Sequence, residues 1–154
     1  MTGWSGKWRR RPVDKTLNYL SLARKAGFAE LGEEPVGAAA RALHAHLIVV
    51  ASDASDHTWR RGKSYVAGTN QQCLRLKYTK DEMGMAIGRT SLAMAAITDP
   101  ALALSLVESL GEGKHEEIAE VLRQRVQQQR QRSKEAKSHQ RNKRLGKPAA
   151  KAKK

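Results

Sequence analysis

Two groups of side chains could in principle do chemistry. Ser52, Asp53 and His57 are the residue types of a hydrolytic centre, but no glycine-framed turn presents the serine as a nucleophile. Asp53 follows a buried apolar run, so capping the next helix is the simpler role for it. His44 and His46 could bind a metal ion, yet two histidines with no cysteine nearby are too few ligands. Neither group predicts a catalytic or metal site.

The single cysteine and the glycine-containing segments do not predict a catalytic or cofactor site either. Cys73 lies within an apolar stretch, which favours a packed thiol over a nucleophile and allows no internal disulfide. The glycine-containing segments lack the Lys-Ser/Thr pattern of a phosphate-binding loop. We therefore expect a protein that is not an enzyme and that uses no cofactor.

Basic residues gather at the two ends of the chain. The net charge is +14 overall, of which residues 1–15 carry +4 and residues 114–154 carry +10, while residues 16–113 sum to zero. A neutral body with basic ends favours a polyanionic partner, and the usual partner of this kind is a nucleic acid.

The first twelve residues interleave aromatic and basic side chains. Tryptophan can stack on an unpaired base for ~1–3 kcal/mol, and arginine can pair with phosphate. We predict that this arm contacts RNA through Trp4, Lys7, Trp8, Arg9, Arg10 and Arg11.

Helical and strand patterns alternate through the neutral body. The apolar spacing predicts helices at about 14–26, 33–43, 55–67, 79–88 and 99–111, and strands at 28–31, 47–51, 73–76 and 92–97. Thr79 and Glu82 form a capping box at the start of one helix. The alternation implies an α/β fold, with a sheet covered by helices on both faces.

Four segments follow from this organisation. They are a basic Trp/Arg arm (1–13), one domain (14–112), an amphipathic helix (113–127) and a basic tail (128–154) expected to be disordered because it lacks apolar residues. No run of 18 apolar residues exists, and the basic start lacks the apolar stretch of a secretion signal. We expect a cytoplasmic protein that does not use a membrane and is monomeric when free.

Two stretches carry a family resemblance: LSLARKAGFAELGEEPVGAAARALHAHLIVVASDAS (residues 20–55) and YTKDEMGMAIGRTSLAMAAITDPA (residues 78–101). Together they resemble the ribosomal protein family that includes the large-subunit proteins seven-Ae and thirty-e, and its small bacterial members above all. The resemblance implies a three-layer α/β/α sandwich with a mixed sheet of about four strands. It also implies binding to structured RNA, such as ribosomal RNA at a kink-turn.

The resemblance further implies two RNA-contacting surfaces, one from Gly32 to Ala38 and one from Gly88 to Leu92. A helix N-terminus offers free N–H groups to phosphates and base edges, and a small glycine-flanked loop can insert between splayed bases. The predicted contact residues in the body are Gly32, Glu33, Glu34, Val36, Gly37, Arg41, Arg24, Lys25, Gly88, Arg89, Thr90, Ser91 and Leu92.

The first surface departs from the pattern Gly-x-Asn-Glu-x-Thr-Lys of kink-turn binders. The glycine is kept, but Glu34 stands at the Asn position, Pro35 at the Glu position and Ala38 at the Lys position. His44 and His46 replace a Lys-x-Lys of many relatives and are mostly neutral at pH 7. These changes predict a less positive surface than kink-turn binders have.

Two other functions compete with binding to ribosomal RNA within or beside the ribosome. One is a general nucleic-acid or nucleoid protein, in which the lysine-rich tail binds DNA without sequence preference. The other is an accessory domain of an RNA-modifying enzyme, which would need a partner chain because no room remains for a catalytic domain.

Overall fold

The computed structural model describes residues 14–111 and 113–144. These residues form six helices and four strands. In chain order they are α2 (Lys15–Lys25), β1 (Ala29–Leu31), α3 (Glu33–Arg41), β2 (Leu47–Val50), α4 (Asp56–Val66), β3 (Gln72–Arg75), α5 (Lys80–Ala86), β4 (Met94–Ile97), α6 (Pro100–Glu108) and α7 (Glu116–Arg144). The helices and strands predicted for the body are confirmed, with small shifts at their ends.

The four strands form one mixed sheet in the order β1-β4-β2-β3. Strand β4 pairs antiparallel with both β1 and β2, and β3 pairs parallel with β2. Strands β1, β2 and β3 therefore run in one direction and end where β4 begins. This arrangement gives the sheet a loop end, defined here as Gly32–Glu34, 51–61, 76–82 and 88–93, and an opposite end where β1, β2 and β3 start.

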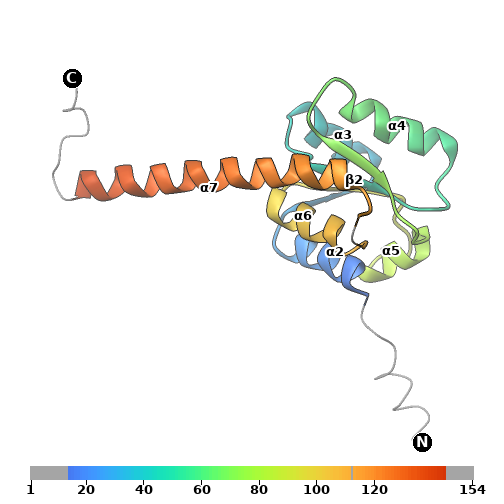
Figure 1. Cartoon of the computed structure of the whole chain (residues 1–154). Coiled ribbons are helices and arrows are strands. Elements are labelled where there is room, and N and C mark those ends of the chain that lie inside the picture. The colour runs from blue at the N-terminus through green and yellow to red at the C-terminus, as the bar shows by residue number, and fades with distance from the viewer. Residues whose placement is uncertain (1–13, 112, 145–154) are drawn as a thin grey trace, which may run out of the picture.

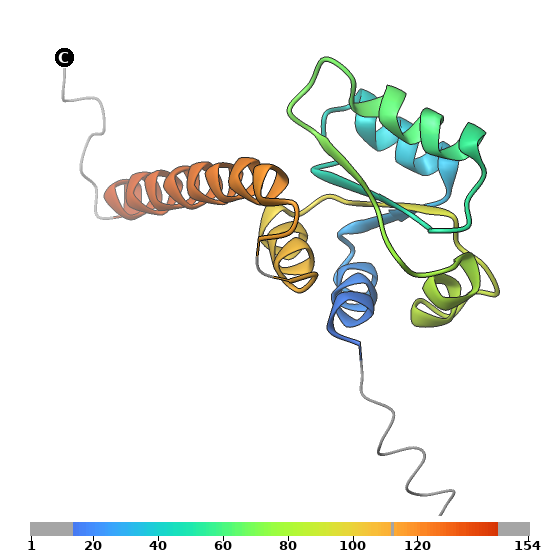
Figure 2. The same cartoon turned by 45° about the vertical axis from the view of Figure 1, so that its right-hand side comes forward.

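Helices cover both faces of the sheet, so the predicted three-layer α/β/α sandwich is confirmed. Helices α3 and α4 pack together on one face, and α2 packs with α5 and α6 on the other (Figure 2). All four residues of β2 and of β4 are buried, which explains their continuous apolar sequences. The edge strands β1 and β3 are only partly buried.

Side chains of the local sequence fix most helix starts. Asp14 caps α2, Ser55 caps α4 and Asp99 caps α6, while Thr79 and Glu82 form the predicted capping box of α5. The expectation that Asp53 caps the next helix is wrong. Ser55 takes that place, and Asp53 Oδ1 accepts a hydrogen bond from the Lys80 N–H at the start of α5 (2.8 Å).

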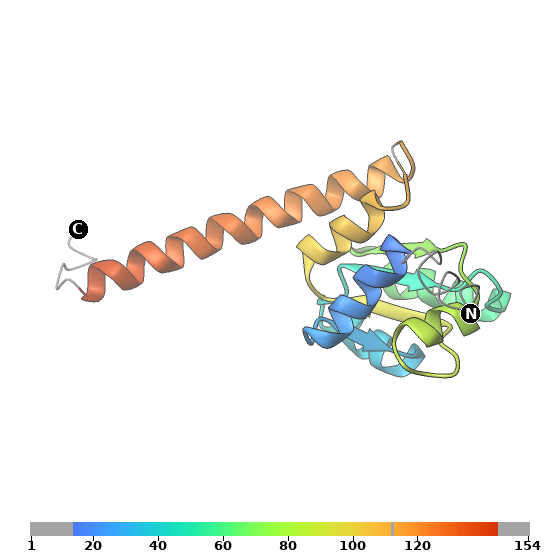
Figure 3. The same cartoon turned by 90° about the horizontal axis from the view of Figure 1, so that it is seen from below.

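The C-terminal segment differs from the expected disordered tail. Helix α7 continues through residue 128 and ends at Arg144, and its first turns bury Ala119, Leu122 and Val126. It lies beside α6 and then extends away from the body (Figures 1 and 3). We expected disorder because these residues lack apolar side chains. A helix whose first turns are already anchored can, however, add further residues at little cost in free energy. Gln, Arg and Lys, which dominate here, are good helix formers. Residues 145–154 lie outside the described part.

Among the described helices, none combines the length and the apolar character that crossing a membrane requires.

The attachment of α7 can be tested at Leu122, which is 1% exposed. Replacing Leu122 by Ala leaves a cavity under α7 and should lower the free energy of unfolding by about 2–5 kcal/mol in urea denaturation. Gln124→Ala, on the exposed side of the same helix, is the matched control and should change it by less than about 0.5 kcal/mol. Equal effects would mean that α7 is not anchored through this side chain.

Candidate nucleic-acid interface

Backbone hydrogen bonds gather four loops at the loop end of the sheet. The Gly32 N–H donates to the Met94 carbonyl and the Ala51 N–H to the Ala93 carbonyl, both at 2.9 Å. The Leu92 N–H donates to the Lys80 carbonyl (3.0 Å), which ties the start of α5 to the loop before β4. The two surfaces predicted from the sequence therefore adjoin.

Gly32 has a backbone conformation that only glycine adopts readily. Its φ is 97° and its ψ is 159°, so a side chain here would be strained. No side chain of the described residues caps α3. Pro35, in the first turn, has no N–H, while the N–H groups of Glu33 and Glu34 remain available to an acceptor.

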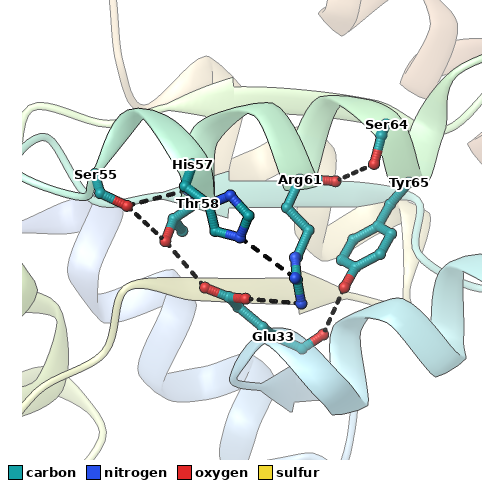
Figure 4. Close-up of polar contacts among 7 residues, drawn as sticks. All are labelled: Glu33, Ser55, His57, Thr58, Arg61, Ser64 and Tyr65. Carbon is teal, nitrogen blue, oxygen red and sulfur yellow. Dashed lines mark hydrogen bonds and ion pairs between the residues drawn. The ribbon is translucent and has the colours of Figure 1, made fainter.

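Glu33 is engaged with the neighbouring helix α4. Its carboxylate accepts a hydrogen bond from the Thr58 hydroxyl (2.9 Å) and forms an ion pair with Arg61 (3.3 Å), as Figure 4 shows. The Tyr65 hydroxyl donates to the Glu33 carbonyl (3.4 Å), and the Ser55 hydroxyl donates to that of Thr58 (3.1 Å). These contacts join the first turn of α3 to α4 and neutralise one carboxylate beside the exposed loops.

Arg61 also contacts His57, one of the residues considered for a hydrolytic centre. Its Nη2 lies 3.3 Å from Nε2 of His57, and Asp53 is bonded to the Lys80 N–H. In the described part of the chain, Asp53 and His57 thus have different hydrogen-bond partners. Burial raises the pKa of the Cys73 thiol to about 11, so it is protonated at neutral pH. Among the described residues, no group of three or more His, Cys, Asp or Glu side chains could hold a metal ion.

The root of the N-terminal arm lies beside the same loops. The hydroxyl of Tyr78, in the loop between β3 and α5, donates to Asp14 Oδ1 at 2.6 Å. The same oxygen accepts from the Thr16 and Leu17 N–H groups at the start of α2. Burial, together with the hydrogen bond to Asp14, raises the pKa of Tyr78 to about 12. Asp14 therefore anchors the point at which the arm joins the body.

The predicted contact residues fall into four groups. Those exposed or half-exposed at the loop end are Gly32, Glu33, Glu34, Gly88, Arg89, Thr90 and Ser91. The arm residues Trp4, Lys7, Trp8, Arg9, Arg10 and Arg11 lie outside the described residues. The other two groups are buried or lie at the opposite end of the sheet.

Three predicted contact residues are buried and cannot meet a partner. Val36 and Leu92 belong to the core. Gly37 faces Tyr65, and a Cβ at this position would lie 2.9 Å from the tyrosine ring. These residues were selected by their position in a motif, but helix periodicity turns Val36 and Gly37 inward.

Three basic residues lie at the opposite end of the sheet. Arg24 and Lys25 end α2 just before β1 starts, and Arg41 ends α3 before β2 starts. All three are exposed, but the topology separates them from the loop end. No local pattern predicts this separation, because it depends on the order and direction of the strands in the sheet.

Sequence reasoning missed Gly84, which shapes the second surface. A Cβ on Gly84 would lie 2.6 Å from the Ser91 nitrogen and 2.9 Å from the Arg89 carbonyl oxygen. The Gly84 carbonyl accepts a hydrogen bond from the Arg89 N–H (2.8 Å). The loop thus folds tightly onto α5, and a glycine inside a predicted helix was the available signal.

Comparisons with solved structures identify the fold. No protein-family model matches the chain, and no curated protein matches it. A protein of unknown function from Bacillus halodurans C has a similar structure, with a TM-score of 0.60 and 23% identity over 64% of this chain and 98% of that one. The Giardia lamblia 15.5kD RNA binding protein is also similar, with a TM-score of 0.56 and 18% identity over 68% of this chain and 87% of that one. The chain therefore shares its fold with an RNA-binding protein.

The tight fit at Gly84 predicts that Gly84→Ala displaces the loop from Gly88 to Leu92. The free energy of unfolding should fall by about 1–3 kcal/mol, because the added Cβ meets backbone atoms that cannot rotate away. Met85→Ala, at an exposed neighbour, should change it by less than about 0.5 kcal/mol. Unchanged stability and loop chemical shifts in Gly84→Ala would contradict this packing.

The Tyr78–Asp14 contact predicts a loss of stability at high pH. The folded-state pKa of Tyr78, about 12, lies above the ordinary value of 10, so its contribution is complete below pH 10 and is lost as the pH rises through about 12. The wild type should lose more unfolding free energy than Tyr78→Phe over this range, measured in urea. Parallel curves would show that the phenol is not held in this way.

Proposed function

We propose that this protein binds structured RNA through the loop end and the adjoining arm, and that it acts by binding without catalysis. The observation that carries the proposal is the meeting of the two predicted surfaces at one end of the sheet, beside the root of the arm. An uncapped helix start and a compact exposed loop can hold phosphates and bases of an irregular RNA. The RNA-binding Giardia protein, with the same fold, supports this assignment.

The loop end itself is close to electrically neutral. It holds five basic and six acidic residues, namely Arg60, Arg61, Lys77, Lys80 and Arg89 against Glu33, Glu34, Asp53, Asp56, Asp81 and Glu82. Three of these carboxylates are engaged, Glu33 with Arg61, Asp53 with a backbone N–H and Glu82 in the capping box. We infer that the loops supply shape recognition and that the basic arm supplies most of the charge attraction at this end.

We also propose a family for this chain and a class of RNA that it binds. The sequence resemblance favours the ribosomal seven-Ae and thirty-e family and ribosomal RNA as the partner. Glu34 and Ala38, which replace the polar and basic positions of kink-turn binders, are exposed beside Gly32. We therefore propose an RNA site of the same general shape that depends less on phosphate contacts from α3 itself.

A second candidate is non-specific nucleic-acid binding driven by the basic C-terminal segment. It is favoured by α7, whose residues 116–144 carry nine Lys/Arg against four Glu and whose second half extends from the body. This function would need neither the loop end nor any RNA structure, so the two candidates differ in which residues control affinity.

Two charge-matched variants of the full chain separate the candidates. Lys77→Gln/Arg89→Gln removes one lysine and one arginine at the loop end, and Arg24→Gln/Lys25→Gln removes the same pair at the opposite end. The loop-end variant should weaken binding to an RNA with an internal loop and short stems about tenfold and reduce the log–log salt slope by about 2. The opposite-end variant should weaken it less than about twofold. Fluorescence anisotropy measures both.

Equal losses for the two variants, or equal affinity for duplex DNA of the same length, would favour the second candidate. No binding of the internal-loop RNA by the wild type would overturn the proposed function itself.

A further inference from the structure

The second half of α7 is a helical arm with no protein surface against it. Residues 127–141 are all exposed, and the arm extends away from the body in every view (Figures 1, 2 and 3). At ~1.5 Å per residue, the part from Gln127 to Arg144 is about 26 Å long. It starts beside α6, on the side of the body away from α5 (Figures 1 and 3).

Four basic residues follow one face of this arm. Arg130, Lys134, Lys137 and Arg141 are spaced by four, three and four residues, so they lie on one side of the helix at about one per turn. We call them the α7 row. Arg125 and Arg132 lie on the opposite side of the same helix. The pKa of His46 is lowered by burial and then by the charge of Arg125, with a smaller effect of Arg132.

Repulsion within the α7 row destabilises the helix in the free protein. Like charges three or four residues apart on a helix repel by about 0.2–0.5 kcal/mol per pair. Arg123, nearer the body, has Glu108, Glu116 and Glu120 as partners. Among the described residues, no carboxylate forms an ion pair with a member of the row, and the nearby Glu135 is bonded to Gln131. A polyanion would remove this repulsion.

The remaining sequence of the arm limits the class of partner that it can bind. The line that buries Ala119, Leu122 and Val126 continues with Gln129, Ser133, Ala136 and Gln140, so it offers no apolar seam for a coiled coil. Residues 112–154 contain no Phe, Trp or Tyr, so the arm cannot stack on bases. A straight row of cations without aromatic residues suits the regular phosphate backbone of a duplex.

We infer that the α7 row docks on the phosphate backbone of an RNA duplex, and that the protein thereby holds RNA at two places, the loop end and α7. The choice of RNA rests on the proposed function. Because the row projects from the side of the body away from α5, the two contacts are independent, and the duplex can be a separate segment of the RNA held at the loop end.

The test uses a fully paired RNA duplex of about 16 base pairs, the length that double-stranded-RNA-binding domains cover. Arg130→Gln/Arg141→Gln removes two arginines from the row, and Arg125→Gln/Arg132→Gln removes two from the other side of the same helix. We expect the first variant to weaken duplex binding about tenfold and to lower the salt slope by about 2, and the second to weaken it less than about twofold. Arg130→Lys/Arg141→Lys should restore the slope, because a phosphate contact needs the charge.

Circular dichroism of all variants should show equal helix content, so that a loss of affinity cannot come from unfolding of the arm. Equal weakening by the two arginine pairs, or equal affinity for a DNA duplex, would overturn the inference. Lys77→Gln/Arg89→Gln should leave duplex binding unchanged. If it still weakens binding to the internal-loop RNA while the row has no effect on the duplex, only this inference fails and the proposed function stands.

Discussion

The antiparallel pairing of β4 with both β1 and β2 is the constraint on which the candidate interface depends. Because of this pairing, the start of β4 lies next to the ends of β1 and β2. Backbone hydrogen bonds from Gly32 to Met94 and from Ala51 to Ala93 join the loops at this end of the sheet. With a parallel β4, the turn before it would lie at the other end. Two loops 50 or more residues apart therefore form one surface because of strand direction and not because of their own sequences.

Charge and shape are separated in this molecule. The loop end is held in place by the Glu33 contacts with α4 and by the close approach at Gly84, but it carries almost no net charge. Net positive charge lies outside the neutral body, in residues 1–15 and 114–154. Electrostatic attraction acts over about 8 Å at physiological salt, so these basic segments can attract a polyanion that the neutral loops do not attract by themselves. In the proposed function, the strength and the selectivity of binding therefore come from different parts of the chain.

How well the sequence predicted each feature depended on how local its cause is. The capping box of Thr79 and Glu82 and the buried strand β2 were predictable because their causes lie within a few residues. Val36 and Leu92 were wrongly expected at the interface because their burial depends on elements packed from elsewhere in the chain. The tail from residue 128 was expected to be disordered because composition alone does not reveal that α7 is already anchored at Leu122.

The sequence by itself determined the order of helices and strands, the capping box that starts α5, and the neutral body with basic ends. These follow from propensity, periodicity and charge, which act along the chain. Only the tertiary structure decided that the two loops adjoin, that Tyr78 holds Asp14 beside them, and that Arg24 and Arg41 lie at the far end. Those facts depend on strand direction and on contacts between residues distant in sequence, which no local pattern encodes.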